Sequence, residues 1–195
     1  GNTNQLQFAI NQQLAFLVMP ISKNFDDRTE LQGLYDTGGC CNIGWLPYHA
    51  KIQEDYPDLF ASFTKLEDVK HENIKIGGIA AHILVTHIAV YYLPWKKGDG
   101  SHYIMEIGLS AELPLNTLFG LPFIIRYGLQ PQWKQQMFIS DVLQEELVMK
   151  LERPIRAPVE DLLYKAGNMT KSFYHKEGKI VQFQENEPPE ALVQI

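Results

Sequence analysis

The residues of this sequence whose types and spacing best suit chemistry are Asp36, Thr37 and Gly38, which directly follow the apolar run Leu31–Tyr35. Taken alone, Asp-Thr-Gly is an ordinary turn, because aspartate caps its own backbone and glycine accepts a positive φ. An aspartate beside a second carboxyl can also share one proton with it, since two adjacent like charges cannot both ionise. Such a pair can deprotonate water with one carboxylate and protonate a carbonyl oxygen with the other carboxyl. The triplet therefore predicts either a turn or half of a pair that hydrolyses peptides.

The second carboxyl of such a pair has no motif of its own in the chain. No further Asp-Thr-Gly or Asp-Ser-Gly occurs among the 195 residues. A two-fold symmetric dimer places identical residues across its axis, and Asp36 would then face its own copy. If the triplet is catalytic, the sequence therefore predicts a homodimer. Five other carboxylates could supply a partner within one chain, although no motif supports any of them; they are Asp26, Asp27, Glu54, Asp55 and Asp58.

The apolar pattern around the triplet predicts the elements that position it. The apolar stretch Leu14–Ile21 predicts a strand, and the polar stretch Lys23–Glu30 predicts the turn of a hairpin. Leu31–Tyr35 predicts the strand that leads into Asp36, and Ile43–Leu46 is apolar again after it. The triplet is thus expected in a loop between two short strands.

The segment Pro47–Leu66 has a different pattern. Its apolar and aromatic residues recur at helical spacing, and Pro57 interrupts them, so we expect two short helices. The residues with this spacing are Ile52, Tyr56, Leu59, Phe60 and Phe63.

Strands are predicted again from Val69 onwards, which makes the expected fold mainly β. The stretch from Phe138 to Leu151 fits either a helix capped by Asp141 or an alternating strand. The expected strands are Ile74–Ile76, Ile83–Trp95, Tyr103–Leu109 and Lys179–Gln184, with a turn at Lys96–Gly100 and the most apolar segment at Leu113–Ile125.

The order of these segments resembles the retropepsin family, the aspartic proteases of retroviruses and retrotransposons, and above all the type encoded in retrotransposon polyproteins. The resemblance covers roughly Phe8–Tyr127. Family members carry a catalytic Asp-Thr/Ser-Gly, a Gly-rich flap, and a hydrophobic-hydrophobic-Gly segment packed behind the active loop. The matching segments here are Asp36-Thr37-Gly38, Ile76–Ile79 and Leu118-Phe119-Gly120. The resemblance implies a small closed β-barrel that is active as a homodimer and needs neither cofactor nor metal.

The resemblance also implies a role for each site residue. Thr37 would hydrogen-bond across the dimer, and Gly38 would let the loop backbone approach both carboxylates. The flap would close over an extended, mainly apolar peptide and donate backbone hydrogen bonds to it. The catalytic residues would be Asp36, Thr37 and Gly38, and the substrate-binding residues would be Gly39, Ile76, Gly77, Gly78, Ile79, Leu118 and Gly120.

Two features depart from the family pattern. The residue after the triplet is often Ala in the family, whereas here it is Gly39, followed by Cys40 and Cys41. The two cysteines suggest either a redox role or small thiols buried under the loop, and the second interpretation is favoured. The segment between triplet and flap is also longer than in compact viral enzymes, so the flap tip could lie nearer residues 80–81.

Composition excludes several classes of partner and site. There are 17 Lys and Arg against 23 Asp and Glu, a net charge of -6, which disfavours nucleic acid as a partner. No apolar run approaches the roughly 20 residues of a membrane span. No Cys-x-x-Cys or paired-His spacing predicts a metal site. Two adjacent cysteines without a disulfide framework indicate a reducing, cytoplasmic location. Because the chain begins with Gly and has no signal region, we expect it to be a piece of a longer protein.

These inferences predict a protease domain over residues 8–130 and a C-terminal extension or spacer over residues 131–195. The predicted function is an aspartic endopeptidase that processes a polyprotein. The alternative from another class is an inactive retropepsin-fold module that dimerises or binds peptides. A third interpretation is a β-rich structural fragment in which Asp-Thr-Gly occurs by chance.

Overall fold

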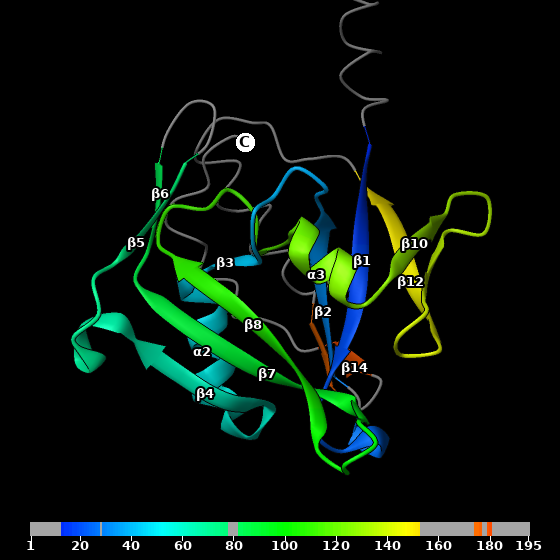
Figure 1. Cartoon of the computed structure of the whole chain (residues 1–195), viewed down its shortest axis with the longest axis horizontal. Coiled ribbons are helices and arrows are strands. Elements are labelled where there is room, and N and C mark those ends of the chain that lie inside the picture. The colour runs from blue at the N-terminus through cyan, green and yellow to red at the C-terminus, as the bar shows by residue number, and fades with distance from the viewer. Residues whose placement is uncertain (1–12, 28, 78–81, 153–173, 177–178, 181–195) are drawn as a thin grey trace, which may run out of the picture.

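The computed structural model describes residues 13–27, 29–77, 82–152, 174–176 and 179–180 (Figure 1). These residues are mainly in strands, which confirms the mainly β part of the predicted fold class. The strands are β1 (Leu14–Ile21), β2 (Thr29–Tyr35), β3 (Ile43–Trp45), β4 (Phe60–Lys65), β5 (Ile74–Gly77), β6 (His82–Val85), β7 (His87–Lys96), β8 (His102–Ser110), β9 (Thr117–Phe119), β10 (Leu129–Gln132), β11 (Met137–Ser140), β12 (Glu145–Glu152), β13 (Tyr174–Lys176) and β14 (Lys179–Ile180). The helices are α2 (Leu46–Asp55) and α3 (Leu121–Arg126), with 3-10 turns η1 (Phe25–Asp27), η2 (Pro57–Leu59) and η3 (Leu66–Val69).

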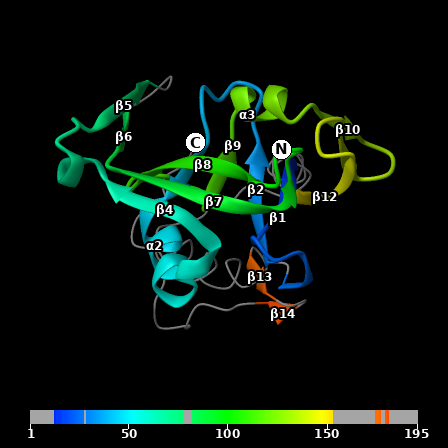
Figure 2. The ribbon, with the colours of Figure 1, turned by 60° about the horizontal axis from the view of Figure 1, so that its bottom comes forward.

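Most strands belong to one sheet, in the order β10-β11-β12-β1-β2-β9-β3-β8-β7-β4. The β13 strand pairs with the first half of β2, and β5 pairs with β6 as a separate hairpin. Among the described residues β10 and β4 do not pair with each other, so the closed barrel remains a prediction. Helix α2 packs against the sheet at β3 and β8 (Figure 2).

The core is built from the inward residues of β1 and the strands beside it. Leu17, Met19 and Ile21 alternate along β1 and are fully buried in the main cluster. Phe16, on the opposite face of β1, is also buried, in a second cluster, so both faces of this strand are covered. Leu17 lies opposite Met149 of β12, whose side chain joins the same cluster. The β12 strand, together with β10 and β11, therefore shares the core of the segments before residue 127.

The structure resolves the ambiguity that the sequence left over Phe138–Leu151. This stretch forms β11 and most of β12 rather than a helix, because Leu147 and Met149 alternate toward the core. The proposed division of the chain at residue 130 stays a prediction. The expected strand at Lys179–Gln184 is present as β14 over its first two residues, and the rest lies outside the described residues.

The prediction of two helices in Pro47–Leu66 is half wrong. Helix α2 and the turn η2 form as expected, but Phe60 and Phe63 belong to β4. The pairing register shifts between Phe60 and Ser62, so Phe60 lies opposite Tyr91 and Phe63 opposite Ala89. This bulge adds one residue, and two side chains three apart then reach the same core face. A bulged strand therefore reproduced the spacing that had indicated a helix.

The apolar run Ile83–Trp95, predicted as one strand, is divided at Thr86 into β6 and β7. The Thr86 backbone N–H donates to the Leu109 carbonyl at 3.0 Å, and its carbonyl accepts the Leu66 N–H at 2.9 Å. The chain changes its pairing partner at this residue, from β5 to β4 and β8.

The described part of the chain contains no helix with the length and hydropathy that a membrane-spanning helix needs.

Candidate active site

The loop that carries Asp36, Thr37 and Gly38 is supported from behind by β9. This strand runs parallel to β2, with Tyr35 opposite Phe119, and antiparallel to β3, with Ile43 opposite Leu118. It therefore lies between the two strands that the loop connects. The structure thus brings together two segments that lie about eighty residues apart in the sequence.

Asp36 itself makes three of the hydrogen bonds that hold its loop. The Asp36 N–H donates to the Phe119 carbonyl at 3.0 Å, which ties the loop to β9. The Gly38 N–H donates to Oδ1 of Asp36 at 2.9 Å, and the Gly39 N–H donates to the Asp36 carbonyl at 3.1 Å. Asp36 is half-buried, whereas Thr37 and Gly38 are exposed. The carboxylate is therefore fixed on a short turn at the surface, where water and a second carboxyl can approach it.

Asn42 closes the far end of this loop, and the sequence analysis did not identify it. Its Oδ1 accepts the Gly120 N–H at 2.9 Å, and its Nδ2 donates to the Glu106 carbonyl at 3.1 Å. Its own carbonyl accepts the Gly108 N–H at 3.0 Å. One mostly buried amide therefore joins the loop to β8 and to the end of β9. Nothing local distinguishes this asparagine from an ordinary loop residue, because its partners are distant in the sequence.

Gly39 and Gly120 lie back to back where the loop meets the end of β9. A Cβ on Gly39 would come within 3.3 Å of the Gly120 Cα, and the Leu121 N–H donates to the Gly39 carbonyl at 2.8 Å. A Cβ on Gly120 would overlap the Cys41 backbone, at 2.7 Å from its carbonyl carbon and 2.8 Å from its nitrogen. Gly120 thus allows a close approach of two backbones, which any side chain would prevent.

Gly120→Ala should lower the free energy of unfolding by about 2 kcal/mol, because the new methyl forces the loop away from β9. Urea denaturation of the variant against the wild type measures the change. The control is Gly98→Ala, since a Cβ there meets no atom within 4 Å. Equal stability of the two variants would contradict the close contact between Gly120 and Cys41.

The other predicted substrate-binding residues are placed differently. Leu118 is 6% exposed and packs with Phe16, Leu34 and Leu115, so it supports the loop from behind. Ile76 is half-buried against the main core, and Gly77 is exposed at the end of β5. The predicted flap residues Gly78 and Ile79, like the alternative tip at residues 80–81, lie outside the described residues. In both views the β5–β6 hairpin lies toward the same end of the molecule as the loop between β2 and β3 (Figures 1 and 2).

Cys40 and Cys41 follow the turn directly, and both thiols are free. Cys41 is half-buried, but Cys40 is exposed, so the prediction of two buried thiols is wrong for Cys40. Burial, reinforced by a hydrogen bond and by charge repulsion from Cys40, raises the pKa of the Cys41 thiol to about 12. Cys41 therefore stays protonated at neutral pH.

Behind β9 lies a buried histidine, His49 of α2, which the sequence analysis also missed. Its Nε2 lies 3.0 Å from the Asn116 carbonyl and 3.0 Å from Oγ1 of Thr117, and its Nδ1 lies 2.7 Å from the Tyr91 hydroxyl. A carbonyl only accepts, so Nε2 carries the proton and Nδ1 accepts the tyrosine proton. Complete burial lowers the pKa of His49 to about 4. A Cβ on Gly44 would overlap the ring, so this glycine provides the space for it.

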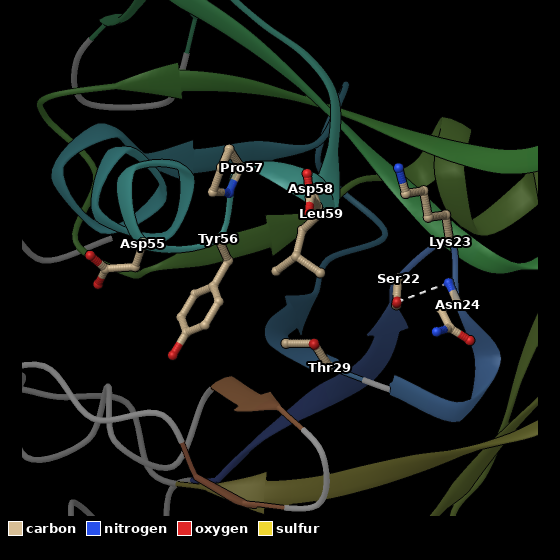
Figure 3. Close-up of a pocket in the computed structure, with 9 residues that line it drawn as sticks. All are labelled: Ser22, Lys23, Asn24, Thr29, Asp55, Tyr56, Pro57, Asp58 and Leu59. Atoms are coloured by element: carbon tan, nitrogen blue, oxygen red, sulfur yellow. Dashed lines mark hydrogen bonds between the residues drawn. The ribbon is translucent and has the colours of Figure 1, made fainter.

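A separate cavity of about 300 Å³ lies at the opposite end of β2 from the Asp36 loop. It is formed where the turn after β1 faces the junction of α2 and η2 (Figure 3). Its lining mixes one ammonium group, two carboxylates and small polar groups, and it contains none of the residues predicted for the catalytic triplet or for substrate binding. Asp55 and Asp58, considered above as partner carboxylates, lie here at the far end of β2 from Asp36. The lining residues are Ser22, Lys23, Asn24, Thr29, Asp55, Tyr56, Pro57, Asp58 and Leu59. Within the described part of the chain, no cluster of three or more His, Cys, Asp or Glu side chains could hold a metal ion.

No protein-family model matches the chain, and no curated protein matches it. Among solved structures, one similar fold is the crystal structure of the retroviral protease-like domain of Ddi1 from Leishmania major. The two chains are 9% identical, with a TM-score of 0.37, over 77% of this chain and 97% of that one. This likeness is distant.

Proposed function

We propose that the protein is a retropepsin-like aspartic endopeptidase that cleaves extended, mainly apolar peptide segments of a polyprotein as a homodimer. The observation that carries this proposal is the position of Asp36 on a surface turn that β9 immobilises through the Phe119 carbonyl. A catalytic carboxylate needs both access and a fixed position, and this turn provides both. The sequence resemblance independently assigns the same residue.

In the proposed reaction, Asp36 and the partner's Asp36 lie close together and share one proton. The ionised carboxylate takes a proton from water as the water attacks the scissile carbonyl carbon. The protonated carboxyl donates its proton to the carbonyl oxygen, and the tetrahedral intermediate then collapses with protonation of the leaving amine. Because Oδ1 of Asp36 already accepts the Gly38 N–H, its carboxylate plane is held by the loop throughout.

The surface beside the loop supports the proposed dimer. Helix α3 begins directly after Gly120, and its first residue is hydrogen-bonded to the loop through the Gly39 carbonyl. Two of its apolar side chains are turned to solvent in the single chain, Leu121 at 39% and Ile125 at 68% exposure. A second copy facing the loop would cover this apolar helix face, which removes its cost of exposure to water.

Ile125→Glu is expected to weaken the dimer about tenfold or more, because the interface would have to bury an unpaired carboxylate. Sedimentation analysis over a range of protein concentrations measures the monomer–dimer equilibrium. Val69→Glu is the matched control, since Val69 is 58% exposed on η3, which follows β4 and lies away from α3 (Figures 1 and 2). Dimerisation of the Ile125 variant at wild-type strength would exclude α3 from the interface.

The direct test of the proposed function is cleavage of a mixed apolar peptide library at a series of pH values between about pH 4 and 7, because the rate depends on the shared carboxyl proton. Cleavage that rises more steeply than linearly with protein concentration supports the dimeric protease. Absence of cleavage by a folded, dimeric sample would contradict it and favour an inactive module that dimerises or binds peptides.

A further inference from the structure

The two thiols beside the proposed catalytic loop are in contact with each other. The Sγ atoms of Cys40 and Cys41 are 3.8 Å apart, and neither is in a disulfide. Cys40 is exposed to solvent and to any small oxidant, while Cys41 is half-buried beneath it. An exposed thiol paired with a neighbouring second thiol is the arrangement expected of a redox-sensitive site.

We propose that Cys40 and Cys41 are such a site, at which a peroxide reversibly joins them in a vicinal disulfide that displaces the Asp36 loop. The Cys40 thiolate attacks one oxygen of hydrogen peroxide, which gives a sulfenic acid and one water. The Cys41 sulfur then attacks the Cys40 sulfur and expels the second water. The two thiols lose two electrons and two protons in total, and the peroxide is reduced to two molecules of water.

The order of these steps follows from the surroundings of the two thiols. Cys40 reacts first because it is accessible, whereas burial holds Cys41 in its protonated, less reactive form. The contact between the sulfur atoms partly compensates for the low reactivity of Cys41, because this thiol does not have to diffuse to reach a sulfenic acid on Cys40. We therefore expect a detectable sulfenic acid on Cys40 before the disulfide closes.

The disulfide would be strained and easily reduced. Adjacent Cα atoms across a trans peptide are about 3.8 Å apart, whereas Cα atoms joined by a disulfide are usually roughly 4.4–6.8 Å apart. Strain of this kind raises the reduction potential and makes a disulfide labile. A dithiol reductant should therefore reopen the bond, as a reversible modification requires.

Closing the ring must disturb the support of the loop. The peptide between Cys40 and Cys41 has to rotate, but the Cys41 nitrogen and carbonyl carbon are within 2.8 Å of a Cβ position on Gly120. The next residue, Asn42, accepts the Gly120 N–H. Rotation therefore either separates Gly120 from Cys41 or breaks the hydrogen bond of Asn42. In both cases the Asp36 turn loses part of its attachment to β9.

The test treats the whole chain with hydrogen peroxide and then with a thiol-alkylating reagent. The expected product has an intact mass two hydrogens lower, carries no alkyl group and unfolds a few degrees lower in temperature. Dithiothreitol should restore both thiols and the original unfolding temperature. Cys40→Ser and Cys41→Ser should each fail to form the intrachain bond, and Cys41→Ser should accumulate the Cys40 sulfenic acid.

Three results would overturn the proposal: two thiols that remain alkylatable, disulfides that form only between chains, or an intrachain disulfide that leaves the unfolding temperature unchanged. The effect on catalysis rests on the proposed function, so it is measured separately. If the oxidised wild type loses peptide cleavage and dithiothreitol restores it, both the redox site and the proposed protease activity are supported. A disulfide that forms and shifts unfolding in a chain that never cleaves peptides would contradict the protease and leave the redox site supported.

Discussion

Asp36→Asn should lower kcat/KM for peptide cleavage by at least about a thousandfold, because neither member of the altered pair can then take a proton from water. The substitution keeps the size and shape of the side chain. The amide oxygen can still accept the Gly38 N–H that Oδ1 of Asp36 accepts in the native loop. The fold and the dimer should therefore remain, and thermal unfolding and sedimentation of the variant check both.

The matched control for this prediction is Asp26→Asn, which makes the same chemical change at an exposed aspartate of η1. Its cleavage rate should stay near that of the wild type, since Asp26 is outside the loop. Cleavage retained by Asp36→Asn would contradict the proposed mechanism and would favour a carboxylate pair elsewhere in the chain. A fall in both variants would assign the loss to a general effect of charge.

Acidification from about pH 6.5 to 4 is expected to lower the free energy of unfolding by about 3 kcal/mol through His49 alone. In the folded protein, burial lowers the pKa of His49 to about 4 from an ordinary value of 6.5. Between these values the unfolded chain binds a proton that the folded chain does not, so stability falls as the pH falls. Above the ordinary pKa the contribution of the neutral histidine is fully present.

Urea unfolding at several pH values measures this loss, and His49→Gln should flatten the dependence within that window. Because His49 is buried and hydrogen-bonded to Asn116 and Tyr91, the substitution also removes packing and hydrogen bonds, and a second measurement on the wild type is needed. Titration of the His49 ring by NMR in the wild type then gives the same information. A ring that titrates near its ordinary pKa in the folded protein would contradict the buried network.

This histidine also bears on the acidic assays of activity. His49 contacts Asn116 and Thr117, which lead into β9, and β9 holds the Asp36 turn. A loss of cleavage toward pH 4 would therefore combine titration of the carboxyl pair with loosening of its support. Circular dichroism recorded at each assay pH separates the two effects, since only the second changes the folded fraction.

Much of the strand framework was predictable from local sequence pattern. The bounds of β1 follow from the apolar run Leu14–Ile21, and β2 and β3 flank Asp36 as expected. These strands are fixed by burial of nearby apolar residues, which a sequence displays directly. The helical interpretation of Phe60 and Phe63 was wrong because a bulge depends on the partner strand, which local pattern does not reveal.

The support of the site was not predictable in the same way. Asn42 and Gly120 are 78 residues apart, and His49 and Thr117 are 68 residues apart. Their roles arise only once β9 is inserted between β2 and β3, which is a long-range property of the fold. The exposure of Cys40 likewise depends on how the loop turns over the end of β9. A motif identifies the reacting group, whereas the residues that position it are set by distant pairing.

The central claim, a site made from two copies of Asp36, is tested most directly by mixing wild-type and Asp36→Asn chains at constant total concentration. After exchange of subunits, only dimers with two native carboxyls should cleave peptide. The account predicts that activity falls as the square of the wild-type fraction. Activity that falls in direct proportion to the wild-type fraction would contradict it, because each chain would then act alone.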